Sequence, residues 1–154
     1  MKGFYQVTET IKNQLLADVN VNTVTTGDIT KIDLSKQTMF PLSHIIVNNV
    51  NNEDNVLRFS ISVLSMDIVD VSKEAVVDIF VGNDNEQDIL NTQLAVITRL
   101  LEVLRKGSSA NTFMLDGNAT LENFTDRFEH GVAGWTRILS RILRSVKRWR
   151  SWSP

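Results

Sequence analysis

The apolar residues of this chain fall into two helical stripes separated by strand-like segments. Phe4, Val7, Ile11 and Leu15 recur at spacings of three and four, which predicts an amphipathic helix over about residues 3–18. A second and broader stripe predicts a helix over about residues 86–106, ended by Gly107. Its members are Leu90, Leu94, Ile97, Leu101 and Leu104. Stripes this regular indicate helices that pack on other elements.

Between these helices the pattern favours three strands. Ile29–Leu34 is predicted to be a short strand, and a second strand starts at Ile45. The cluster Asn51-Asn52-Glu53-Asp54-Asn55 indicates a polar turn. Beyond it, apolar and polar residues alternate from Leu57 to Val63 and then change phase, which suggests a β-bulge near Val63. We therefore expect a long antiparallel hairpin.

The remaining segments complete an α+β plan. Ser72–Val81 is ambiguous between strand, arm and loop, and Asp84 or Asn85 is a suitable N-cap for the second helix. Further strands are expected at 113–115, 120–128 and 132–135. The order of helix, three strands, helix and two or more strands predicts a mainly antiparallel sheet with both helices on one face.

Composition describes one ordinary globular domain. The chain has 154 residues, of which 42% are hydrophobic and 22% charged. It contains no cysteine, which excludes disulfides and thiolate chemistry. No apolar run is long enough to span a bilayer, and the N-terminus lacks the apolar core of a signal peptide. We expect a protein that stays in a cytosol-like compartment.

Charge is strongly segregated along the chain. Residues 1–136 hold all 18 carboxylates but only 10 of the 16 Lys and Arg, a net charge of −8. The last 18 residues hold six basic residues and no acid. They are Arg137, Arg141, Arg144, Lys147, Arg148 and Arg150. If this segment is helical, the basic residues line one face and apolar residues another, a pattern that would bind anions such as nucleic acid or a membrane surface. The alternatives are a solvated basic face or a tail that complements the acidic body.

Signals for catalysis are weak. Ser43 and His44 are adjacent, so on a strand they point to opposite faces and cannot act as a nucleophile–base pair. His130 belongs to no metal-binding spacing. The acidic segment 84–88 lacks the ordered spacing of an EF-hand loop and is better explained as a helix cap. The prediction is a protein that is not an enzyme and needs no metal or cofactor.

Several stretches, taken together and in order, resemble one protein family. They are Gly3–Leu16, Asn22–Asp28, Asp33–Thr38, Phe40–His44, Met66–Ser72, Gly82–Gln93 and Ala133–Trp135. They are similar to the tail terminator, tail completion or neck-region proteins of tailed double-stranded DNA bacteriophages. The resemblance covers about residues 1–135 and rests on no catalytic signature.

The resemblance implies a small sheet covered by helices on one face and a structural role in the virion. Such proteins form a ring, here expected to have six copies with twelve as the alternative, that caps the tail tube and joins it to the head connector. The expected partners are further copies of this chain, the tail tube protein and the connector proteins, with genomic DNA passing through the lumen. An acidic body suits that lumen, because like charge limits sticking to phosphates. A head–tail stopper or a ring of a short-tailed particle is the alternative within this class.

The resemblance ends after Trp135, so we predict a domain at residues 1–135 and a basic extension at 136–154. The extension is either an added binding element or the product of a shifted reading frame. Ring contacts are expected at the hairpin tip and in the ambiguous segment. The residues are Asn51, Asn52, Glu53, Asp54, Asn55, Val76, Ile79 and Phe80.

Overall fold

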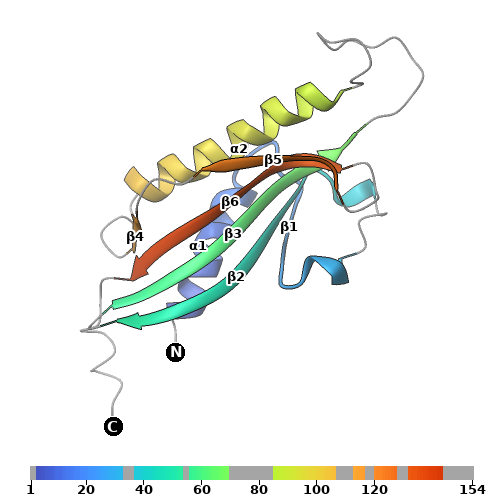
Figure 1. Ribbon diagram of the computed structural model, residues 1–154. Helices are drawn as coiled ribbons and strands as arrows, with labels where there is room; N and C mark the ends of the chain where they lie inside the picture. The colour runs from blue at the N-terminus through green and yellow to red at the C-terminus, as the bar shows by residue number, and fades with distance from the viewer. Residues whose placement is uncertain are drawn as a thin grey trace.

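A computed structural model describes residues 3–32, 37–53, 56–69, 85–106, 113–116, 120–127 and 132–143. Within these ranges the chain forms two α-helices, two 3-10 turns and six strands (Figure 1). The helices are α1 (Gly3–Leu16) and α2 (Glu86–Lys106), and the 3-10 turns are η1 (Ile29–Lys31) and η2 (Gln37–Met39). The strands are β1 (Thr23–Thr26), β2 (Leu42–Glu53), β3 (Val56–Ile68), β4 (Phe113–Asp116), β5 (Leu121–Arg127) and β6 (Val132–Leu143).

The six strands form one sheet in which only β1 and β2 are parallel neighbours. The order is β1-β2-β3-β6-β4, and β5 also pairs with β6. β3 lies at the centre and pairs with β2 over Val56–Met66 on one side and with β6 over Leu57–Ile68 on the other. The α+β class, the mainly antiparallel sheet and the order of elements are confirmed.

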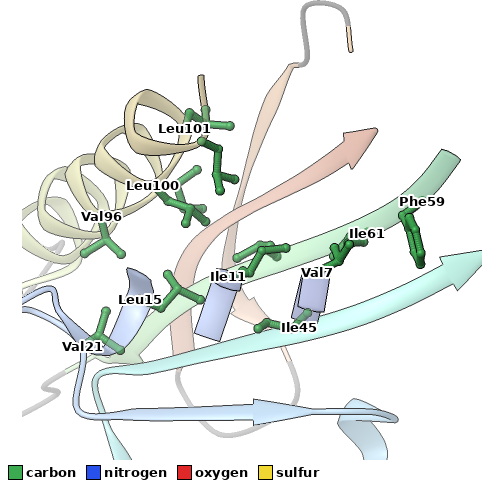
Figure 2. Close-up of a cluster of buried hydrophobic side chains, with 13 residues drawn as sticks. Val7, Ile11, Leu15, Val21, Ile45, Phe59, Ile61, Val96, Leu100 and Leu101 are labelled. Atoms are coloured by element: carbon green, nitrogen blue, oxygen red, sulfur yellow. The ribbon is translucent and has the colours of Figure 1, made fainter. Parts of the chain in front are cut away.

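Both helices cover the same face of the sheet and share one core with it. α1 contributes Val7, Ile11 and Leu15, which are at most 1% exposed. Figure 2 shows these side chains between the strands and α2. The remaining buried members of this helix-face core come from the turn after α1, from β2 and β3, and from α2. They are Val21, Ile45, Phe59, Ile61, Val63, Val96, Ile97, Leu100, Leu101 and Leu104. The spacing of the two stripes therefore predicted which face of each helix is buried, except that Phe4, the first member of the α1 stripe, is 42% exposed.

The opposite face carries a second, smaller core. Its buried members are Leu42, Leu64, Met66, Phe124 and Val132, from β2, β3, β5 and β6. Partly buried residues of the segment between β1 and β2 pack against it, among them Ile29 and Ile32. Both faces of β3 are consequently buried between Val63 and Met66.

The predicted bulge near Val63 is wrong, because both faces of β3 are buried there. The phase of apolar residues changes in β3 because the second face becomes covered there, not because a residue is inserted. The register irregularity lies in the partner strand, between Val47 and Asn49. Asn48 is the extra residue, and its side-chain amide donates to the Ser62 hydroxyl at 2.8 Å.

The predicted strand at Ile29–Leu34 is also wrong for residues 29–32, and residues 33 and 34 lie outside the described residues. Asp28 accepts from the backbone N–H of Thr30 at 3.0 Å and from its hydroxyl at 2.8 Å, so it caps a 3-10 turn at Ile29–Lys31. The three-residue spacing of Ile29 and Ile32 suits such a turn, and both pack on the second core. The strand of this region, β1, lies earlier in the sequence.

A further correction concerns the C-terminal segment. β6 crosses the predicted boundary at residues 135 and 136 and continues to Leu143, paired with β3 throughout. Residues 137–143 are therefore part of the sheet, and the helical interpretation fails for them. The ladder with β3 extends along the whole of β6, from Val132 to Leu143.

Gly134 marks a place where two strands approach too closely for any side chain. A Cβ atom there would overlap the Ser65 carbonyl oxygen and would lie 2.8 Å from Met66 Cα. The contact is with backbone of the central strand, which cannot move without disturbing the β3–β6 ladder.

We predict that Gly134→Ala lowers the free energy of unfolding by about 1–3 kcal/mol or more, the usual cost of overpacking a core. Urea unfolding followed by circular dichroism measures this. Ala133→Gly, one residue away on the same strand, is the comparison, because it removes a methyl group rather than adding one. Equal stability of Gly134→Ala and the unsubstituted protein would contradict the close approach.

Candidate assembly surface

His44, which the sequence offered as a candidate for chemistry, has a structural role. His44 is fully buried in β2, and its Nε2 lies 2.8 Å from the Gly27 carbonyl oxygen. A carbonyl can only accept, so Nε2 carries the proton and Nδ1 accepts from the Thr25 hydroxyl at 2.7 Å. His44 thus fastens β1 and the Gly27 turn to β2, and both ring nitrogens are used.

Burial lowers the pKa of His44, and the Gly27 carbonyl and the charge of Asp28 oppose that shift only in part. The folded protein therefore keeps His44 neutral at a pH where the unfolded chain is protonated. As the pH falls through about 6.5, the unfolded state takes up a proton that the folded state does not, and stability decreases.

We predict that acidification from pH 7.5 to 5.5 lowers the free energy of unfolding through His44, by at most ~1.4 kcal/mol for each pH unit below 6.5. The variant His44→Gln is less stable at pH 7.5 but lacks this part of the pH dependence. Urea titrations of both proteins at the two pH values measure the difference. Parallel pH dependence in the two proteins would rule out His44 as its source.

The described residues contain no group of three or more His, Asp or Glu side chains placed to bind a metal ion. His130 and Asp84 lie outside the described residues, whereas Glu86 and Asp88 of the acidic segment 84–88 lie in the first turn of α2. Of the helices that the structure describes, none has the length and apolarity needed to cross a membrane.

The clearest candidate for a contact surface is the far end of the β2–β3 hairpin. Here β2 runs past the short strand β1, so Ile46–Glu53 has β3 on one side and no strand on the other within the described residues. Figure 1 shows β2 along the edge of the sheet, reaching beyond β1. The side chains of Asn49–Asn52, which follow the bulge, are exposed, and we call these four residues the β2 edge segment.

Apolar side chains are exposed on this edge and at the start of α1. Val50 is 41% exposed and pairs with Phe59, which places it on the helix-bearing face. At the start of α1, Phe4 and Tyr5 are 42% and 67% exposed, with ring centroids 6.0 Å apart in an edge-to-face arrangement. α1 contacts β2 within the helix-face core. Tyr5 is off the buried stripe of α1, so helical spacing alone would have indicated its exposure.

A second apolar surface lies at the other end of α1. A groove of about 450 Å³ runs between the turn after α1 and α2, lined in part by Val19 and Val103. Val19 is 95% exposed. At the rim, Arg99 donates from Nε and Nη2 to the two carboxylate oxygens of Asp18 at 2.7 and 2.9 Å. This hydrogen-bonded ion pair lowers the pKa of Asp18 and links the turn to α2.

Buried polar contacts hold α2 against the sheet. The Ser65 hydroxyl donates to the Gln93 side-chain oxygen at 2.5 Å, and both residues are buried. Trp135 donates from its indole N–H to the Leu90 carbonyl at 2.7 Å. These contacts fix α2 from the side of the core, and Thr98 and Glu102 on its outer face are exposed.

The structure separates the predicted anion-binding residues. Arg137 is only 4% exposed and lies on the helix-bearing face, where burial and the charge of Arg105 lower its pKa. Arg141 belongs to β6 and pairs with Phe59 and Leu115. Arg144, Lys147, Arg148 and Arg150 lie outside the described residues. Arg137 and Arg141 therefore do not belong to one exposed helical face.

The predicted contact residues are also divided. Asn51 and Asn52 lie in the β2 edge segment, and Glu53 ends β2. Asp54 and Asn55, together with Val76, Ile79 and Phe80, lie outside the described residues.

Comparison with known proteins adds no family assignment. No protein-family model matches the chain, and no curated protein matches it by sequence.

Proposed function

We propose that this chain is a structural protein of a tailed bacteriophage, a tail terminator or tail completion subunit and not an enzyme. It forms a ring, of six copies or of twelve, that caps the tail tube and meets the head connector, with DNA passing through its lumen. It is assembled in the host cytoplasm and resides in the neck of the virion. A head–tail stopper, or a ring of a short-tailed particle, uses the same surfaces at a different position.

One observation carries this proposal: the β2–β3 hairpin extends past β1, and within the described residues the outer side of Asn49–Asn52 has no strand neighbour. Val50 in this segment, and Phe4 and Tyr5 in α1, expose apolar side chains. Apolar groups in such a position are costly for an isolated monomer and favourable when another subunit covers them. The resemblance of residues 1–135 to ring-forming tail proteins supplies the identity of the assembly. The structural use of His44 supports a role without catalysis.

We predict that the purified protein forms particles with the mass of six or twelve chains, visible as rings by negative-stain electron microscopy. Multi-angle light scattering after size exclusion measures the mass. Tyr5→Asp places a charge in the exposed apolar surface and should shift the distribution toward smaller species.

Asn91→Asp is the matched control, because it adds the same charge at an exposed position of α2 where no large apolar side chain is exposed. It should assemble like the unsubstituted protein. A chain that remains monomeric at every concentration, and that binds neither tail tubes nor connectors, would refute the proposed function.

A further inference from the structure

Two strand segments at opposite edges of the sheet each lack a neighbour within the described residues. One is the β2 edge segment, Asn49–Asn52, and the other is the outer side of β4, Phe113–Asp116. Figure 1 shows β2 and β4 on opposite sides of β3 and β6. Each segment has four residues.

The two segments lie at the same level of the sheet. The pairings β2–β3, β3–β6 and β6–β4 connect the two segments, and none of them has a register shift there. Residues paired directly across these strands form one row of the sheet. Following these ladders, Phe113 lies in the same row as Asn52, and Asp116 lies in the same row as Asn49. A rotation from one copy to the next, with no slide along the strands, therefore brings the two segments side by side.

The peptide groups of the β2 edge segment point in a direction that permits pairing. The Ile45 carbonyl accepts from the Gly27 N–H at 3.2 Å, so the peptide groups of Ile45 face outward, away from β3. Outward and inward groups alternate along a strand, and the extra residue Asn48 shifts this alternation by one. Val50 and Asn52 consequently direct their N–H and C=O groups outward.

The same alternation can be followed across the ladders to β4. It directs the peptide groups of Phe113 and Leu115 outward and those of Met114 toward β6. Asn52 is thus level with Phe113, and Val50 is level with Leu115. In both rows the outward N–H and C=O groups of one segment would meet those of the other. The two segments can therefore pair without a shift in register.

The directions of the strands match as well. β2 and β6 run one way, and β3 and β4 run the other, because each adjoining pair between them is antiparallel. A β4 placed against β2 of another copy therefore continues the antiparallel alternation of the sheet. The contact joins two different edges, which is the head-to-tail type of interface that generates rings.

The β2 edge segment also lacks the features that normally prevent edge pairing. Residues 46–52 contain no Lys, no Arg and no Pro. The bulge at Asn48 precedes the segment and leaves four residues in regular register with β3.

We propose that Asn49–Asn52 of one copy pairs antiparallel with Phe113–Asp116 of the next copy, so that the sheets of neighbouring subunits join around the ring. This inference rests on the proposed function, because it names the contact by which the ring is built. The occupant of the β2 edge is a second copy of this chain. Backbone hydrogen bonds supply the contact, and the exposed Val50 adds apolar burial beside it.

Asn52→Pro tests the edge directly. Proline removes an outward N–H and adds a ring at that edge, and proline is tolerated on edge strands whose N–H faces away from the sheet. We expect a folded protein whose assembly requires a concentration at least about tenfold higher. Asn52→Ala keeps the N–H and should assemble as the unsubstituted protein does. Normal ring formation by Asn52→Pro would overturn the proposed contact and leave the proposed function intact.

A cross-link provides a second test that does not depend on a proline. The chain has no cysteine, so Asn51→Cys and Met114→Cys introduce the only two thiols. In the proposed contact, Asn51 of one copy lies opposite Met114 of the next. The peptide groups of both residues point back into their own sheets, so the two form a non-hydrogen-bonded pair. Cα atoms of such a pair lie about 4.5 Å apart, which permits a disulfide.

Under mild oxidation the double variant should give a ladder of covalent oligomers up to the ring on a non-reducing gel. Each single variant is the control and should give at most dimers. Rings that form without a ladder would refute the pairing, whereas failure of the unsubstituted protein to form rings would refute the proposed function and this inference with it.

Discussion

Burial of both faces of β3 is the constraint on which the rest of the structure depends. From Val63 to Met66 every side chain of this strand is buried, alternately against the helices and against the second core. A strand covered on both faces and paired on both edges has no freedom to slip, because a shift of one residue would exchange its two faces. The close approach at Gly134 and the contact between Ser65 and Gln93 both exist because β3 is fixed in this way.

The sequence predicts well those elements whose burial is one-sided. The stripes of α1 and α2 have helical periodicity, and the structure places both helices within two residues of the expected bounds. β3 between Leu57 and Val63 alternates in the expected way because only one of its faces is covered there. The pattern becomes ambiguous where a second layer forms, since an insertion and a second covered face both look like a change of phase. The sequence does contain the correct signal for the bulge, which is the three-residue interval between Val47 and Val50.

The C-terminal segment contains a different ambiguity. Arg137 and Arg141 are four residues apart, a spacing that puts two residues on one face of a helix and also on one face of a strand. The basic composition favoured the helix, but pairing with β3 is a tertiary effect that no local pattern contains. The sequence predicts contacts at Asn51 and Asn52 as parts of a turn, but it does not show that they belong to a strand edge. Within the described residues that edge has no neighbour because β1 is only four residues long. His44 likewise acquires its structural role from Thr25 and Gly27, which no sequence spacing connects to it.

The bulge at Asn48 links the core to the proposed contact. Without the extra residue, strict alternation would direct the Val50 side chain to the face opposite the helices and would place Asn49 and Asn51 on the helix-bearing face. The bulge instead keeps Val50 on the face of Phe59, and it turns the peptide groups of Val50 and Asn52 toward the outer edge. One inserted residue therefore satisfies the core and sets which backbone groups another subunit meets. Because the core determines the side-chain faces and the bulge determines the outward groups, the geometry of the β2 edge follows from how β3 is buried.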